Sequence, residues 1–161
     1  MSDEVYLGNP LLKKANVAQE FTKEQIIEFI ACREDPVYFA KKHVKIVSLD
    51  EGLVAFQPYD FQEELIRNFH KNRFNICKMP RQTGKSTTSV AYLLHYAVFN
   101  DNTNIGILAN KAATARDLLG RLQTAYENLP KWMQQGIISW NKGSLELENG
   151  SKILAASTSA S

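Results

Sequence analysis

The spacing of hydrophobic residues predicts helices along much of the chain. Apolar residues that recur every three or four positions line one side of a helix, where they pack against a core. A capping box at 22–25 marks one helix start, and Asp35 followed by Pro36 marks another, because aspartate caps a helix and proline fits its first position. The predicted helices cover residues 22–33, a short stretch from 36, a stretch from 60, and residues 85–99 and 111–128.

Shorter apolar runs predict strands between these helices. A hairpin is expected over 44–56, and two consecutive hairpins over 137–156. Residues 73–79 and 105–109 flank the fourth predicted helix and are predicted as buried strands, with Cys77 in the first of them. Alternating strands and helices are typical of a parallel sheet with right-handed crossovers. We therefore predict an α/β fold with a mainly parallel sheet flanked by helices.

The chain is expected to consist of an arm and one domain. Residues 1–20 are polar, with a breaker at Gly8-Asn9-Pro10, which indicates an irregular arm that lies on another surface. Residues 21–161 form the domain, in which the early helices and the first hairpin make a small subdomain ahead of the sheet. The last predicted strand is followed by neither a helix nor an acidic strand end, and the family resemblance given below implies that this domain is incomplete.

Composition and charge narrow the possible functions only slightly. The 161 residues are 44% hydrophobic and 22% charged, which is typical of a globular domain, and no apolar run is long enough to span a bilayer. We therefore expect an intracellular, soluble protein. The net charge of +2 does not identify a nucleic-acid binder, because such a protein needs basic residues gathered on one face.

The cysteines and histidines share no spacing that is typical of a metal site. Cys32 and Cys77 are far apart in the sequence and are expected to be inert thiols. His43, His70 and His95 are expected to be surface or core histidines rather than metal ligands.

The stretch Met79–Ser86 contains the residues that point most clearly to a binding site. Its end, Gly84-Lys85-Ser86, matches the phosphate-binding loop, although Met79 stands where the first glycine of the general motif would be. Consecutive loop amides and a helix N-terminus form an anion site, and glycine lets the backbone approach a phosphate closely. Because a predicted strand precedes the loop and a predicted helix follows it, we favour a phosphate loop over a chance occurrence of these residues.

Each loop residue has an expected role. Lys85 would neutralise the β- and γ-phosphates of ATP, and the Ser86 hydroxyl would complete the oxygen shell of Mg²⁺. Arg81 lies near the place where charge develops on the γ-phosphate and is a candidate for transition-state stabilisation. Arg81 and Lys85 are thus the candidate catalytic residues. The other nucleotide-binding candidates in this stretch are Gln82, Thr83, Gly84, Ser86 and Thr87.

The sequence resembles the large terminase subunit of tailed phages, of the myovirus type, over almost all of residues 10–161. The segments that carry the resemblance are Asp35–Ala40, Gln57–Gln62, Arg81–Ser86, Gly106–Lys111, Leu129–Ile137 and Trp140–Ser144. In that family the phosphate loop regularly lacks its first glycine and carries the internal arginine, so Met79 departs only from the general motif. The resemblance implies a P-loop NTPase fold with ATP and Mg²⁺ as cofactors.

The resemblance also implies an adenine-recognising segment at 57–62. A glutamine amide offers a donor and an acceptor, as the N6/N7 edge of adenine requires, and Gln62 is the first candidate, followed by Gln57. Phe61 is a possible stacking partner for adenine, but we expect it in the core, because it shares an apolar stripe with other helix residues. Asp60 is equally well explained as the N-cap of that helix.

Large terminases continue after the last hairpin with an apolar strand that ends in Asp-Glu, then a coupling motif and a nuclease domain, and none of these occurs before Ser161. The chain is therefore expected to bind ATP as part of a DNA-packaging motor but to hydrolyse it negligibly by itself. The resemblance implies double-stranded DNA, the portal and the small terminase subunit as partners, a homo-oligomeric ring in the assembled motor, and the cytoplasm of the infected bacterial host. The alternatives are a non-hydrolysing ATP-binding or assembly module and a DEAD-like helicase fragment, although such helicases keep the first glycine of the loop.

Overall fold

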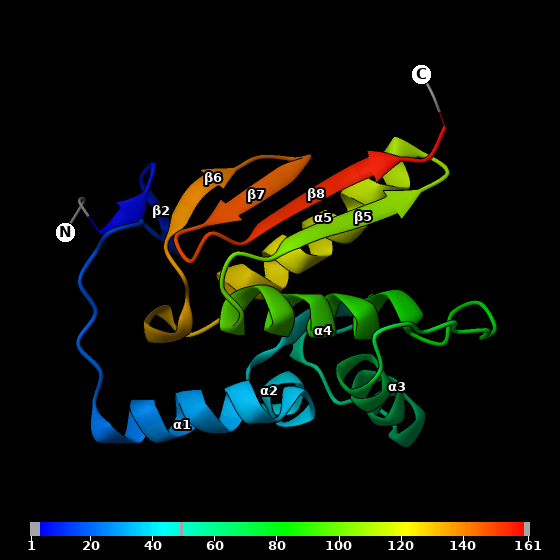
Figure 1. The fold of residues 1–161 in the computed structure, drawn as a ribbon, viewed down its shortest axis with the longest axis horizontal. Coiled ribbons are helices and arrows are strands. Elements are labelled where there is room, and N and C mark those ends of the chain that lie inside the picture. Colours follow the sequence, from blue (N-terminus) through cyan, green and yellow to red (C-terminus); the bar gives the residue numbers. More distant parts are fainter. Residues whose placement is uncertain (1–3, 49, 160–161) are drawn as a thin grey trace.

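The computed structural model describes residues 4–48 and 50–159, which form a mixed α/β structure with one larger sheet. The four strands of this sheet are β5 (Asn104–Ala109), β6 (Ile137–Trp140), β7 (Ser144–Leu147) and β8 (Lys152–Ser157). They stand in the order β5-β8-β7-β6. Figure 1 shows the sheet on one side of α4 (Lys85–Phe99) and α5 (Ala112–Glu127), with the helices of residues 23–71 on the other side.

The prediction of a mainly parallel sheet is wrong. Only β5 and β8 run parallel, while β6, β7 and β8 form an antiparallel meander from the two hairpins predicted at this end of the chain. The meander supplies three of the four strands. Its last strand, β8, lies between β5 and β7. β5 is consequently an edge strand, and Leu108 is 65% exposed where a buried strand was expected.

The helices ahead of the loop agree with their predicted positions. They are α1 (Lys23–Glu34), α2 (Pro36–His43) and α3 (Asp60–Lys71), with the hairpin of β3 (Lys45–Ser48) and β4 (Gly52–Ala55) between α2 and α3. The capping box is confirmed, because Gln25 N donates to Thr22 Oγ1 at 3.2 Å and Thr22 N donates to Gln25 Oε1 at 3.0 Å. Asp35 caps α2 as predicted, whereas the N-cap of α3 is Tyr59 and not Asp60.

The buried core joins α4 and α5 to the sheet and to the early helices. Leu94 and Val98 of α4 and Leu119 and Leu122 of α5 are at most 1% exposed, and each contributes about 1.5–3 kcal/mol of apolar burial. This packing fixes the position of α4, whose first residue is Lys85. The helix therefore holds the end of the predicted phosphate loop in a defined place.

Residues 73–79 do not form the predicted strand. The segment has no regular secondary structure and pairs with none of the described strands, and the side chains of Phe74 and Ile76 are 83% and 101% exposed. An apolar run forms a strand only where a neighbour accepts and donates its main-chain hydrogen bonds. Cys77 is exposed for the same reason, so the interpretation of Cys77 as a buried thiol is wrong.

Part of the predicted irregular arm, residues 5–13, forms a hairpin, while residues 17–20 are irregular as predicted and residues 1–3 lie outside the described residues. The strands of the hairpin are β1 (Val5–Tyr6) and β2 (Asn9–Lys13), and they lie near the short helix η1 (Lys131–Met133). The Gln134 side chain makes two hydrogen bonds to the backbone of β2. Its Oε1 accepts from Lys13 N at 3.0 Å, and its Nε2 donates to Leu11 O at 3.0 Å. The N-terminal segment, which was predicted to lie on another surface, thus packs against the domain of its own chain.

Candidate phosphate-binding site

The loop before α4 has the backbone of an anion site. Gln82 and Gly84 have φ values of 62° and 75°, and Gly84 is the N-cap of α4. The first helical hydrogen bond runs from Thr88 N to Gly84 O at 2.9 Å, so the amides of residues 85–87 are those that a helix leaves without an intrahelical acceptor. These amides and the positive end of the helix dipole favour an anion at this point.

Gln62 braces the loop from the first turn of α3. It is 5% exposed, its Oε1 accepts from Tyr59 N at 2.9 Å, and its Nε2 donates to Thr83 O at 3.1 Å. A Cβ atom at Gly84 would lie 2.4 Å from this Nε2. The left-handed backbone therefore favours glycine at this position, and a Cβ atom there would also displace the Gln62 amide from Thr83 O.

Lys85 folds back over the loop. Its Nζ donates to Met79 O at 3.0 Å and also to Pro80 O. The second contact brings the ammonium group against the start of the loop, while the Cα of Lys85 lies at its end. The loop is thus bounded by the Lys85 ammonium group on one side and by the N-terminus of α4 on the other, and both attract an anion.

The remaining predicted loop residues differ in exposure. Arg81, Gln82 and Ser86 are exposed, whereas Thr83 and Thr87 are partly buried. Thr83 Oγ1 donates to Pro80 O at 3.0 Å and so closes the loop on itself. The structure thus gathers the predicted residues 81–87 in one turn and leaves the Arg81 side chain open to solvent.

A cavity of about 780 Å³ lies beside the loop. Gln82 and Thr87 line it on the loop side, Ile46 and Val47 of β3 on another side, and Asp117 and Arg121 of α5 opposite. Its volume lies within the range of small-molecule sites. The sequence did not predict that α5 lines this cavity. Its Asp and Arg four residues apart are a pair that is common on helix surfaces.

The segment ahead of the loop carries an exposed aromatic pair. Tyr59 and Phe61 stack with their ring centroids 5.8 Å apart and their planes at 11°, and they are 70% and 44% exposed. The prediction that Phe61 belongs to the core is wrong, because Leu65 carries the buried stripe of α3 one turn later. Gln57 is exposed in the same segment, in contrast to the buried Gln62.

Comparison with known protein families matches residues 76–161 to the family described as terminase large subunit, T4likevirus-type, N-terminal. The match covers more than half of the chain, including the loop, α4, α5 and the whole sheet. The chain belongs to this family. The resemblance inferred from the loop and its flanking segments is thereby confirmed.

Membership in the large terminase family gives the chain a role in phage DNA packaging, in which the protein acts within a complex with other proteins. Large terminase subunits are generally ATPases. Among the described residues, no helix is both long enough and apolar enough to cross a membrane.

Proposed function

We propose that this chain binds ATP with Mg²⁺ through residues 81–87, as the ATP-binding part of a packaging motor. One observation carries the proposal, namely that the left-handed Gly84 caps α4 while the Lys85 side chain folds back to the Met79 carbonyl at the other end of the same short loop. Loop amides, helix dipole and lysine then act on one anion. Calorimetric titration of the chain with ATP in Mg²⁺ tests it, since binding of one nucleotide per chain is expected.

Ser86 and Arg81 complete the proposed site. Ser86 is exposed on the first turn of α4, where its hydroxyl would contribute one oxygen to the octahedral shell of Mg²⁺. Arg81 forms no ion pair with the described carboxylates, and its guanidinium would stabilise the charge that develops on the γ-phosphate. The structure fits both roles, because the two side chains are exposed at opposite ends of the same loop.

The adenine-reading role is proposed for the segment 57–62, and the two glutamines are expected to behave differently. Because the amide of Gln62 is bonded to Tyr59 N and Thr83 O, Gln62→Ala should weaken ATP and GTP binding alike, through loss of loop support. Gln57 is exposed, so Gln57→Ala should lower the ATP-over-GTP preference, by roughly three- to tenfold for one lost hydrogen bond. Competition binding with both nucleotides measures this ratio. If only Gln62→Ala lowered the preference for ATP over GTP, the adenine contact would be assigned to Gln62 instead of Gln57.

Turnover by residues 1–161 is a separate matter from binding. Phosphoryl transfer needs an oriented water in addition to the bound phosphates and the metal. The expectation of negligible hydrolysis therefore stays a prediction, and a steady-state phosphate-release assay checks it with Lys85→Ala as the blank. Release that depends on Lys85 at rates well above this blank would place a water-activating group within the chain.

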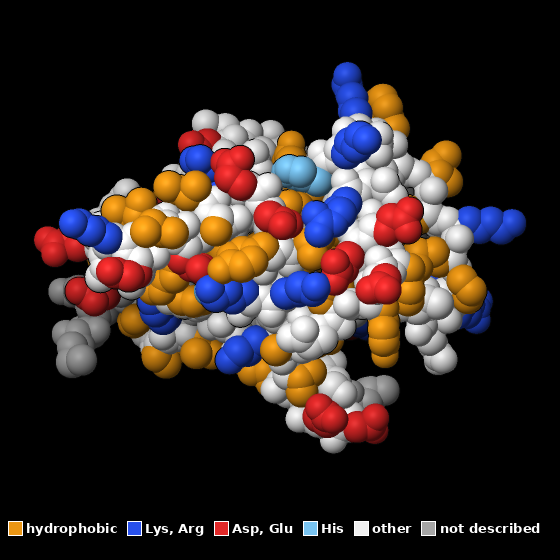
Figure 2. Space-filling view, turned by 90° about the horizontal axis from the view of Figure 1, so that it is seen from below, with side chains coloured by type: hydrophobic (Ala, Val, Ile, Leu, Met, Phe, Trp, Pro, Cys, Tyr) orange, Lys and Arg blue, Asp and Glu red, His pale blue; other side chains and the backbone are white. Residues whose placement is uncertain are grey.

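The proposed role in the motor is to couple ATP to translocation of double-stranded DNA, together with the portal, the small terminase subunit and further copies in a ring. A DNA-binding face needs basic side chains that are gathered together. On the face formed by α1–α3, Figure 2 shows Lys and Arg interspersed with Asp and Glu. We therefore assign no DNA contact to that face.

A further inference from the structure

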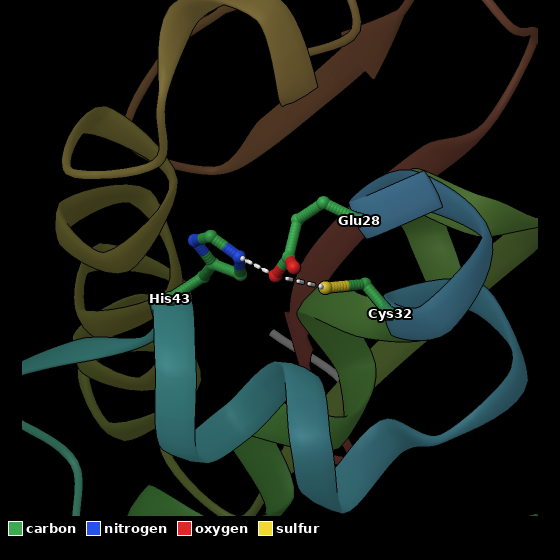
Figure 3. A group of neighbouring side chains, drawn as sticks. All are labelled: Glu28, Cys32 and His43. Atoms are coloured by element: carbon green, nitrogen blue, oxygen red, sulfur yellow. Dashed lines mark hydrogen bonds and ion pairs between the residues drawn. The ribbon is translucent and has the colours of Figure 1, made fainter. Parts of the chain in front are cut away.

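Glu28, Cys32 and His43 form a cluster of metal-ligand side chains outside the phosphate loop (Figure 3). Glu28 and Cys32 lie one turn apart on α1, which places them on the same side of the helix, and His43 is the last residue of α2. One donor atom from each side chain lies within 4.8 Å of the other two. Three different donor types thus converge between two helices.

The carboxylate of Glu28 uses its two oxygens differently. Oε1 faces the cluster, 2.7 Å from His43 Nε2 and 3.5 Å from Cys32 Sγ. Oε2 accepts from the Tyr38 hydroxyl at 2.9 Å and from Lys42 Nζ at 2.8 Å. Ligating carboxylates are commonly oriented by outer hydrogen bonds of this kind, and Oε1 is the oxygen that faces the other two potential ligands.

The cluster is largely shielded from solvent. Cys32 is fully buried, and the side chains of Glu28 and His43 are 18% and 11% exposed. The three side chains therefore meet in a largely enclosed place between α1 and α2.

We propose that Glu28 Oε1, Cys32 Sγ and His43 Nε2 bind a zinc ion that joins α1 to α2. Sulfur, imidazole nitrogen and carboxylate oxygen are the three donors that zinc takes in proteins, and water would be the fourth ligand. Zinc–ligand bonds of 2.0–2.3 Å put tetrahedral donors roughly 3.3–3.6 Å apart. The 3.5 Å between Sγ and Oε1 already fits, and the His43 ring would withdraw from Oε1 by about half an ångström.

Lys42 and Tyr38 would remain bonded to Oε2, outside the metal shell. Sequence spacing did not indicate the site, because Cys32 and His43 belong to different helices and meet only through the packing of α1 on α2. The competing explanation is a brace made of hydrogen bonds alone, and it predicts no metal affinity.

Cobalt(II) titration of the full chain in the Cys77→Ser background tests the proposal, because Cys32 is then the only thiol. One equivalent of Co²⁺ should produce a thiolate charge-transfer band with visible bands of tetrahedral intensity, and Zn²⁺ should displace it. His43→Ala keeps the thiol but should weaken Co²⁺ binding at least roughly 100-fold. Tyr38→Phe, which removes only an outer donor, should weaken it about tenfold.

Circular dichroism of every variant establishes that the helices are intact. As a second measurement, Zn²⁺ should raise the melting temperature of the Cys77→Ser chain relative to the same chain in EDTA. The absence of a charge-transfer band in the folded Cys77→Ser chain would overturn the proposal. A band that His43→Ala leaves unchanged in affinity would also overturn it, since Cys32 would then bind cobalt without the cluster.

Discussion

Lys85→Ala is expected to weaken binding of Mg²⁺-ATP by roughly 30-fold, which corresponds to about 2 kcal/mol. The ammonium group of Lys85 lies against the carbonyls of Met79 and Pro80, in the loop that leads into α4. Alanine removes this charge and its charge-assisted hydrogen bonds to phosphate oxygens. Because Lys85 is only partly buried and is not in the core, the melting temperature without nucleotide should change little.

Calorimetry of the two proteins with Mg²⁺-ATP gives the comparison, and Lys142→Ala is the matched control. Lys142 is exposed in the turn between β6 and β7, so its loss removes the same charge away from the loop. It should leave the affinity within about twofold, as expected for a screened surface charge. Equal affinities for Lys85→Ala and the original chain would remove the loop from the nucleotide site.

Gly136→Ala is expected to destabilise the fold by about 2–3 kcal/mol. A Cβ atom at this position would lie 2.5 Å from Ala15 Cα and 2.7 Å from Lys14 O, which are backbone atoms of the N-terminal segment. The Glu148 carboxylate joins the two segments at this point, because it accepts from Gly136 N at 2.8 Å and from Asn16 N at 2.8 Å. The clash can be relieved only by moving the segment away, which also breaks these hydrogen bonds.

Thermal unfolding measures this effect, and a fall of roughly 5–10 °C is expected for a chain of this length. Gly120→Ala is the matched control, because Gly120 lies within α5 and a Cβ atom added there would have nothing within 4 Å. That substitution should be neutral or stabilise by up to about 1 kcal/mol, since alanine favours a helix over glycine. A Gly136→Ala protein as stable as Gly120→Ala would show that the N-terminal hairpin is not packed as described.

Local signals predicted most of the helices and hairpins correctly. The capping box at Thr22 and the Asp35-Pro36 start act within one turn, so they need no knowledge of distant residues. The same holds for the two consecutive hairpins after Gly136, whose turns carry Asn and Gly. The start of α4 at Gly84 and Lys85 also agrees with the order of elements predicted from the sequence, while the roles of these two residues stay a prediction.

The errors arose where the partner of a segment decides its structure. Residues 73–79 have strand composition, but strand formation requires a neighbouring strand, and none of the described strands pairs with them. The parallel pairing of β5 with β8 joins residues nearly fifty positions apart and leaves no periodic trace in the sequence. The brace from Gln62 to Thr83 is of the same long-range kind, and so the sequence could not distinguish loop support from base recognition.

Hydrogen–deuterium exchange with and without Mg²⁺-ATP tests the nucleotide site most directly, because the proposed ligands are largely backbone amides. Peptides that cover residues 81–88 should be protected by Mg²⁺-ATP, whereas peptides that cover β7 (Ser144–Leu147) should exchange unchanged. The same experiment on Lys85→Ala should show little protection at equal nucleotide concentration. No protection of 81–88 by saturating Mg²⁺-ATP, or protection confined to other segments, would contradict the assignment of this loop as the ATP site.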